Sequence, residues 1–251
     1  MNQEFIAIYF LWKREIIRFL RSKSRIIGSI GMPFFFLVML GFGIGGIVSL
    51  EGGGSYLDFV APGILGMVLL FGSVFSGAIV IIDKQFGFLK ETLVAPVRRE
   101  SIVLGKALGG ASTAVIQGML MIFVMAILGV SIPLHTIPLL FAVMFLVSIA
   151  FVSLGISLAS IMEDMHGFQL IVNFLIFPMF LFSGAIFPLD SVPEILQYLS
   201  YIDPLTYGVD AMRIVLMGTA RFSLALDLGV LVAFLAVTTS LAAYLFRRIE
   251  N

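Results

Sequence analysis

The sequence contains long stretches without any aspartate, glutamate, lysine or arginine, and these stretches decide what the chain can fold into. A helix needs about 20 mostly apolar residues to cross the hydrocarbon core of a bilayer. Five stretches reach or approach that length: 26–50, 59–82, 107–162, 165–189 and 228–246. Because 60% of the residues are hydrophobic and only 12% are charged, the chain cannot cover a soluble fold with polar surface. The sequence therefore predicts an all-α integral membrane protein.

The longest of these stretches, 107–162, exceeds the length of one crossing. Pro133, His135 and Pro138 interrupt it near its middle, which indicates a short turn between two helices. Splitting it there predicts a single transmembrane domain over residues 1–251. Its six spans lie near 26–50, 59–82, 107–131, 137–162, 167–189 and 228–246.

The basic residues predict the orientation of these spans. All lysines and arginines except Arg213 and Arg221 fall in segments on the same side as the N-terminus. Basic residues in short loops stay in the cytoplasm. An odd number of spans would place Arg247 and Arg248 on the opposite side. We therefore expect a multi-pass protein with both termini in the cytoplasm.

Residues 4–22, ahead of the first span, are predicted to form an amphipathic helix at the membrane surface. Apolar residues recur with helical spacing from Phe5 to Leu20, and basic residues such as Lys13 crowd the other side. Trp12, the one tryptophan of the chain, lies on the apolar stripe, as an interfacial anchor would. Membrane lipid is therefore an expected partner. Two roles are open: an anchor alone, or an anchor that also touches a cytoplasmic protein.

Two further segments are predicted to be helical without crossing the membrane. The inner connection 83–106 contains a short amphipathic helix that ends at Pro96. Such a helix either rests on the bilayer or inserts apolar side chains into a groove of a soluble protein. The outer segment 183–227 combines turn residues with apolar pieces too short to cross. We expect re-entrant helices there, with a helix-turn-helix near 186–202.

No recognisable nucleotide-binding or thiol chemistry is present in the sequence. It has no cysteine, which excludes thiolate metal sites and cysteine nucleophiles. Gly105 and Lys106 are followed by Ala107, whereas a phosphate-binding loop needs serine or threonine at that point. We therefore predict no catalytic residue and no cofactor on this chain.

The remaining polar candidates are few. Glu163, Asp164 and His166 are close in sequence, but nothing nearby completes a coordination shell, so we predict a solvated turn and no metal site. Inside the spans, Ser76, Gln117 and Asn173 are candidates for a translocation path. Helix–helix hydrogen bonding is the alternative for each of these polar residues.

Two local patterns resemble those of a known family, and the likeness in order and spacing covers essentially the whole chain. These are FGFLKETLVAPVRRESIVLGKALGG at 86–110 and FSGAIFPLDSVPEILQYLSYIDPLTYGVDAMR at 182–213. Together with the six-span plan, both resemble the ABC type-2 permease family. Its members are the membrane subunits of ATP-driven exporters, similar to those for drugs, antibiotics and cell-surface polysaccharides.

The resemblance implies partners and a location that the residues alone did not indicate. Two permease copies, identical or different, would pair in the plasma (inner) membrane of a prokaryote. Separate ABC ATPase subunits would carry ATP-Mg and dock beneath them, and no nucleic acid is involved. The first and fifth spans would face the second permease, and the second and fifth would line the path.

The resemblance also identifies the inner loop helix as a coupling helix that seats in the ATPase. The residues implied are Phe86, Phe88, Leu89, Lys90, Glu91 and Leu93. We expect Leu89→Asp or Leu93→Asp to uncouple transport while leaving membrane insertion intact.

Two other classes of protein are compatible with six spans. A self-sufficient secondary carrier or channel would move its cargo without an ATPase. Such carriers usually place ionisable residues at membrane depth or consist of two similar halves, and the sequence shows neither clearly. A membrane-embedded enzyme or scaffold is the third class. An enzyme would need clustered histidine and acidic residues at span ends, where only Glu163, Asp164 and His166 are available.

Overall fold

The computed structural model describes residues 3–45, 55–219 and 221–249. Helices are the only regular structure in these residues. Six helical runs are long and apolar enough to cross a membrane, which confirms the predicted all-α, six-span plan. They are Lys23–Gly43, Tyr56–Gln85, Arg99–Ile127, Leu134–Ile161, Met165–Phe182 and Leu224–Arg247.

Four of the six runs are built from more than one helical segment. Span 1 is α2 (Lys23–Val38) continued by the π-helical η1 (Met39–Ile44), and span 2 is α3 (Tyr56–Gly77) followed by α4 (Ile79–Gln85). Span 5 consists of α8 (Met165–Ile171), the π-helical η3 (Val172–Ile176) and α9 (Phe177–Phe182). The other spans are α6 (Arg99–Ile127), η2 with α7 (Leu134–Thr136, Ile137–Ile161) and α12 (Leu224–Arg247).

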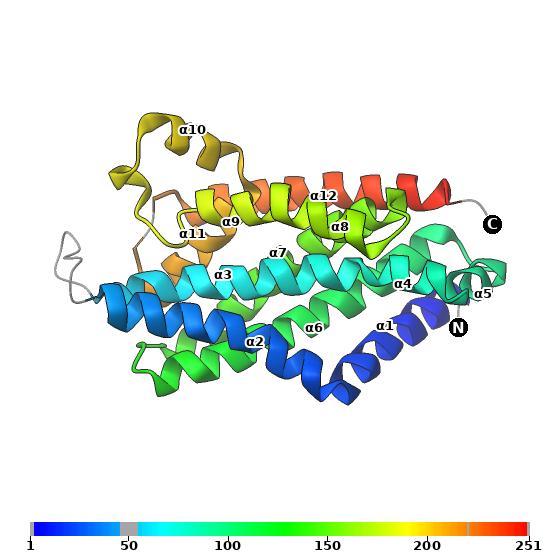
Figure 1. Cartoon of the computed structure of the whole chain (residues 1–251), viewed down its shortest axis with the longest axis horizontal. Coiled ribbons are helices and arrows are strands. Elements are labelled where there is room, and N and C mark those ends of the chain that lie inside the picture. Colours follow the sequence, from blue (N-terminus) through cyan, green and yellow to red (C-terminus); the bar gives the residue numbers. More distant parts are fainter. Residues whose placement is uncertain (1–2, 46–54, 220, 250–251) are drawn as a thin grey trace.

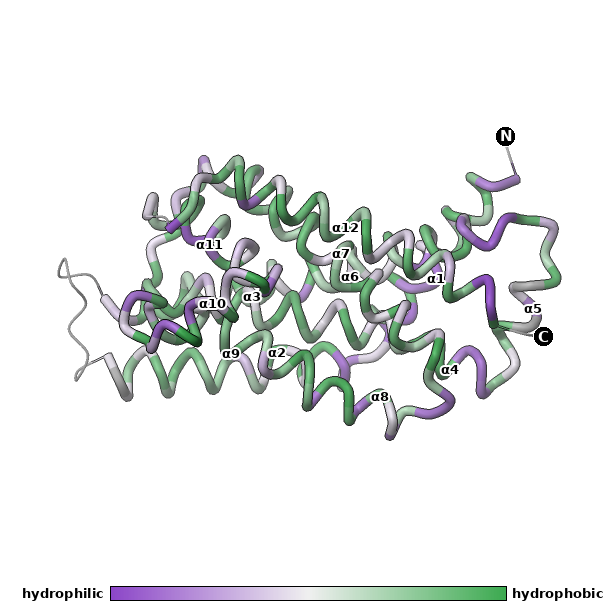
Figure 2. Tube along the Cα trace, turned by 90° about the horizontal axis from the view of Figure 1, so that it is seen from above, coloured by the Kyte–Doolittle hydropathy of each residue, from purple (hydrophilic) through white to green (hydrophobic). Residues whose placement is uncertain are grey.

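Short helices lie at the two ends of this bundle (Figure 1). At one end are α1 (Gln3–Arg21), α5 (Phe88–Val94) and the C-terminal end of α12; at the other are α10 (Glu194–Ile202) and the start of α11 (Pro204–Met217). Hydrophobic residues dominate the middle of the bundle, and hydrophilic residues are concentrated toward its ends (Figure 2). This distribution is what a membrane-spanning bundle requires, because lipid offers no partner to polar groups.

The second span is the centre of the bundle, and glycines allow its close packing. A Cβ atom built on Gly77 of α3 would lie 2.5 Å from the carbonyl carbon of Gly155 in α7. One built on Gly155 would lie 2.5 Å from the carbonyl oxygen of Val74. Neither position has room for a side chain. Helices in membranes gain stability by such close backbone approach, since burial of apolar area between them gains little over lipid.

Several predicted boundaries differ from those in the structure. Part of the first predicted span, residues 46–50, lies outside the described residues. Span 5 ends at Phe182, seven residues before the predicted end at 189, because Gly184 takes a positive φ of 70° that breaks the helix. In the outer segment, residues 186–202 contain the short 3₁₀ helix η4 (Leu189–Ser191) and then α10, and α11 follows α10 after Asp203. Their entry into the outer leaflet remains a prediction.

The N-terminal helix α1 packs against α6, whereas the sequence predicted a helix lying on lipid. Trp12 donates from Nε1 to Ser112 Oγ of α6 (3.0 Å), and Phe19 is buried. The close approach is possible because α6 carries Gly109, where a Cβ would lie 2.7 Å from the Cβ of Glu15. Phe5 and Phe10 of α1 remain exposed, so an apolar face is still available to the membrane.

Candidate functional site

A cavity of about 670 Å³ lies between spans 1, 2 and 5. Ligand pockets in proteins typically measure roughly 300–1,000 Å³, so this cavity can accommodate a drug-sized molecule or an acyl chain. Figure 1 shows α2 and α8–α9 on either side of α3, on one face of the bundle. The walls are mainly apolar: Met32, Pro33, Met67, Val68, Phe71, Phe75, Ala78, Ile79, Ile82, Met165 and Phe177. Arg25, Ser29 and Gln117 are its polar side chains.

Gln117 reaches this cavity from α6, behind the second span. Gly72 makes this possible, because a Cβ there would lie 2.7 Å from Gln117 Oε1. Gln117 is buried, and its side-chain amide makes no hydrogen bond to any residue that the structure describes. A buried amide without a protein partner is costly unless water or a ligand satisfies it. Gln117 is therefore the strongest of the three predicted path residues.

The structure does not bring the other two predicted path residues to the cavity. Ser76 is buried where spans 2, 3 and 4 meet, and its Oγ would lie 2.7 Å from a Cβ on Gly110. Asn173 is exposed on η3, where its Oδ1 accepts from Gln169 Nε2 (3.2 Å). The sequence could not distinguish these positions because all three residues are isolated polar groups in apolar helices.

The predicted coupling helix is present as α5, at the end of the bundle where both described chain ends lie (Figure 1). Gly87 precedes it with a φ of 78°, a conformation that favours glycine. Phe86 is 72% exposed, Phe88 is 47% exposed and Val94 is 84% exposed. Such a group of exposed apolar side chains marks an interaction surface with membrane or protein. We call Phe86, Phe88 and Val94 the α5 apolar patch.

The remaining predicted coupling residues differ in their exposure to solvent. Leu89 is only 2% exposed and packs into the core of the bundle, so it is unavailable as a surface contact. Leu89→Asp would therefore bury a charge and destabilise the protein itself, which makes it unsuitable as an uncoupling variant. Glu91 is exposed. The backbones of Lys90 and Leu93 lie in α5, while their side chains are outside the part that the structure describes.

A cluster of charges is buried directly behind α5. Asp83 of α4 is 1% exposed and pairs with Lys106 of α6, which is 5% exposed. Arg14 and Arg18 of α1 both donate to Asp83 Oδ1 at 3.1 Å. One carboxylate thus joins the end of span 2, the start of span 3 and the N-terminal helix. We call Asp83, Lys106, Arg14 and Arg18 the Asp83 cluster.

Further contacts link the helices of the Asp83 cluster to α5, to the start of α6 and to the end of span 4. The guanidinium of Arg14 lies over the ring of Phe88 at 5.3 Å, a cation–π distance. Glu4 accepts from the backbone N–H of Arg98 at 3.2 Å, next to the first turn of α6. Lys84 donates to the carbonyl of Met162 (3.3 Å), beyond the end of span 4. Movement of α5 would therefore be felt by several spans at once.

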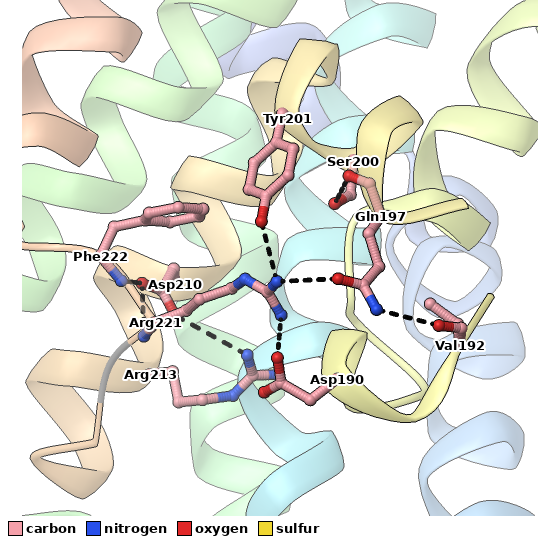
Figure 3. A network of polar contacts seen from close by, with 9 residues as sticks. All are labelled: Asp190, Val192, Gln197, Ser200, Tyr201, Asp210, Arg213, Arg221 and Phe222. Carbon is pink, nitrogen blue, oxygen red and sulfur yellow. Dashed lines mark hydrogen bonds and ion pairs between the residues drawn. The ribbon is translucent and has the colours of Figure 1, made fainter. Parts of the chain in front are cut away.

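The opposite end of the bundle has its own polar network (Figure 3). Arg221 donates to Asp190 (2.8 Å), to the hydroxyl of Tyr201 (3.0 Å) and to Gln197 (3.4 Å). Asp210 of α11 accepts from the backbone N–H of Arg221 (3.1 Å). These contacts join α10, α11 and the segment that leads into α12, and they hold this end of the bundle together.

Asp203, between α10 and α11, is a buried acidic residue at this end of the bundle. Its Oδ1 accepts from the backbone N–H of Leu205 (2.9 Å), as an N-cap residue does. Burial raises the pKa of Asp203 from 3.8 to about 7, and the hydrogen bond from Leu205 opposes this rise. The carboxyl is therefore partly protonated at neutral pH.

The pKa of Asp203 predicts a pH-dependent stability. Because the folded-state pKa is raised, its contribution to stability is fully present below about 3.8 and is lost as pH rises through about 7. The loss is at most about 1.4 kcal/mol per pH unit. We expect Asp203→Asn, which retains the cap, to flatten the fall in apparent melting temperature between pH 5 and pH 8. Identical pH profiles for the two proteins would contradict this expectation.

Asp164, which the sequence placed in the possible metal group with Glu163 and His166, has a structural role in the helix that follows it. Asp164 accepts from the backbone N–H of Gly167 (2.7 Å) and caps α8. No group of three or more histidine, cysteine or acidic residues that could hold a metal ion is found within the described ranges 3–45, 55–219 and 221–249.

Sequence reasoning missed the Asp83 cluster and the outward position of Val94. A signal for the first was present, since Asp83 and Lys106 stand at the two ends of the inner connection. Antiparallel neighbouring spans bring the ends of their connection together, and opposite charges at those ends are candidates for pairing. No comparable signal separates Val94 from Leu89, because a short helix must be placed on the bundle before its faces can be assigned.

Comparisons with known proteins agree with this arrangement. A family model described as "ABC-2 type transporter" matches residues 6–217. Nodulation protein J of Rhizobium leguminosarum bv. viciae is 27% identical over 243 residues, which cover 95% of this chain and 93% of that protein. The putative transport permease ycf38 of Cyanophora paradoxa is 30% identical over 215 residues, 82% and 72% of the two chains. The inner membrane transport permease YadH of Escherichia coli strain K12 is 25% identical over 238 residues, 94% and 92%.

Proposed function

The chain belongs to the ABC-2 type transporter family and is a membrane permease subunit of an ABC transporter, and from this premise we propose how it works. Two copies would form an exporter in the inner membrane of a prokaryote, with both termini in the cytoplasm. Separate ABC ATPase subunits would bind ATP-Mg and dock at the α5 apolar patch. The name of the YadH relative supports the location. The family supports the ATPase partner.

The observation that supports this proposal best is the cavity between spans 1, 2 and 5. It brings together the spans expected to form the path and the interface with the second permease. Exposed apolar side chains flank it on both sides, including Phe35 and Met39 of span 1 and Phe174 of span 5, which is 82% exposed. A second copy on this face would cover them and enclose the cavity.

The proposed motion is a change between two states of this pair. Closure of the ATPase subunits around ATP would move the two α5 helices together. The Asp83 cluster would pass this movement to spans 2 and 3, because buried ion pairs hold the helices as one body. ATP drives the change only if the ATPase pair binds it more tightly in one state than in the other.

A transport assay tests the proposal and separates it from a self-sufficient carrier. The chain is co-expressed with its ABC ATPase subunit in inside-out vesicles, whose cytoplasmic face is turned outward, and ATP-Mg and the fluorescent amphiphile 11-(dansylamino)undecanoic acid are added outside the vesicles. We expect accumulation that needs ATP and the ATPase. Equal accumulation in vesicles that contain the permease alone would favour the secondary carrier and contradict the ATP-driven mechanism.

Gly28 allows a sharp test of the cavity in the same assay. It lines the cavity, and a Cβ built there meets no atom within 4 Å, so a large side chain can enter without distorting the helix. We expect Gly28→Trp to lower ATP-driven transport by about tenfold or more, because the indole ring would occupy space that the cargo needs, and a tenfold loss corresponds to about 1.4 kcal/mol.

Gly31 is the matched control for Gly28. It is on the same helix, a Cβ there also meets nothing within 4 Å, and it does not line the cavity. Gly31→Trp should leave transport close to that of the unmodified protein. Equal effects of the two substitutions would show that the cavity is not the path.

A further inference from the structure

Among the residues that the structure describes, Arg25 is the charged one that lines the cavity. It is in the first turn of α2, next to the junction of α1 and α2. The side chain is half-buried. Within the described residues no carboxylate lies within 4.0 Å of its guanidinium, and no side-chain hydrogen bond is formed by it. The acidic residue with which it interacts at longer range, Glu15, is paired with Arg18 at 3.5 Å.

An unpaired guanidinium at the mouth of an apolar cavity has two explanations. A basic residue at a span end commonly extends its charge toward lipid headgroups. Arg25, however, lines the same space as Phe71 and Phe177, which lie deeper along the spans. A molecule in this cavity would meet a cation at one end and apolar walls along its length. The partly buried cation strengthens an interaction with an anion, because the surroundings exclude water.

Gln117 adds a second polar feature at greater depth. Its amide borders the cavity opposite Gly72 and has no hydrogen-bonding partner in the described chain. An amide both donates and accepts hydrogen bonds and carries no charge. It suits a neutral polar group, such as an ester, an amide or a hydroxyl. The order from the cytoplasmic end is therefore a cation, an apolar wall and a neutral amide.

We propose, building on the proposed function, that the cavity takes an amphiphile with an anionic head group, whose head pairs with Arg25 and whose apolar chain lies along α2 and α9. The head would be a phosphate or a carboxylate, since a guanidinium binds both in the same bidentate manner. The cargo would enter from the cytoplasmic leaflet, at the level of Arg25.

Binding to the purified permease tests this inference without any ATPase. The full chain is placed in nanodiscs of phosphatidylcholine, which lacks net charge. Fluorescence titration then compares 11-(dansylamino)undecanoic acid with its uncharged methyl ester. We expect the acid to bind about tenfold more tightly or better, as a charge-assisted hydrogen bond allows. Equal affinities for acid and ester would overturn the inference.

Variants identify the residue responsible for the preference. Arg25→Gln should reduce the affinity for the acid to that for the ester, while Arg25→Lys should retain most of the preference. Arg21→Gln removes an exposed arginine of α1 that does not line the cavity, and it should change nothing. If Arg25→Gln kept the full preference for the acid over the ester, the proposal would be wrong.

Two further arms locate the probe and separate an amphiphile from a free anion. Gly28→Trp should abolish binding of the acid; unchanged binding would place the probe at the lipid surface and overturn the inference. Hexadecyl phosphate should displace the probe, whereas inorganic phosphate at the same concentration should not. Equal displacement by both would show that the site recognises only the anionic group and not the apolar chain, which would contradict the inference. These arms measure binding without any ATPase, so binding that behaves as expected while ATP-driven transport is absent would contradict the proposed function and leave this inference standing.

Discussion

Replacing Phe86 and Val94 together by aspartate should abolish ATP-driven transport while the permease remains folded and inserted. Both side chains are largely exposed on or beside α5, so the charges stay in water and cost the permease little. In the proposed complex they occupy an apolar groove of the ATPase. Burying two carboxylates there without a partner is strongly unfavourable, and aromatic anchors at interfaces often contribute about 2 kcal/mol or more each. We expect transport at the background of the assay and loss of the ATPase on co-purification.

Leu134→Asp is the matched control for this double variant. Leu134 is 81% exposed, comparable to Val94, and lies in η2, in the connection between α6 and α7. This connection is at the end of the bundle away from α5 (Figure 1). This substitution should leave transport and co-purification near those of the unmodified protein. Apparent melting temperatures of all three proteins should agree. If the double variant kept both transport and ATPase, the α5 apolar patch would not be the docking surface.

The elements that could be predicted from the sequence are those defined by local properties. A span is recognised from one uninterrupted apolar stretch, whereas the orientation inferred from the basic residues stays a prediction. The six spans are of this kind, and so is the existence of α5, whose end at Val94 is set by the approaching Pro96. The neutral total charge gave no guidance, so only the positions of the charges could be used.

The parts of the candidate site that the sequence missed depend on contacts between distant residues. Leu89 and Phe86 are both apolar residues of one short segment, and only the position of α5 against the bundle buries the first and exposes the second. Arg14 and Asp83 are 69 positions apart, and their pairing follows from α1 lying along α6. Arg25 looks like an ordinary basic residue at a span end until spans 1 and 5 are placed on either side of span 2.

Breaking the Asp83 cluster should have the largest effect on stability. In Asp83→Asn the ammonium of Lys106, which is 5% exposed, loses the carboxylate that compensates its charge. Removing one partner of a buried ion pair typically costs about 3–5 kcal/mol, because the other charge is left uncompensated. Arg14 and Arg18 suffer less, since about a third of each side chain reaches solvent. We expect a marked fall in apparent melting temperature and in the yield of inserted protein.

A double substitution distinguishes the cost of leaving one buried charge without a partner from the cost of losing the ion pair itself. In Asp83→Leu with Lys106→Met both buried charges are gone, and replacing a buried pair by apolar residues is often neutral or stabilising. The double variant should therefore be more stable than Asp83→Asn, although one residue more is changed. Asp190→Asn serves as the surface control, because Asp190 pairs with Arg221 but its side chain is 86% exposed. It should cost about 0–1 kcal/mol.

The transport activity of the stable double variant then decides what the Asp83 cluster does. Ion pairs that only hold the helices together can be replaced by apolar packing, and transport would survive. Ion pairs that transmit movement from α5 cannot be replaced in this way. Asp83 joins α4 to both α1 and α6 through directed contacts that leucine lacks. We expect a permease that is folded and binds an ATPase that still hydrolyses ATP, while transport is at least about tenfold slower, which corresponds to roughly 1.4 kcal/mol of lost coupling. Transport at the unmodified rate would assign the cluster to stability alone.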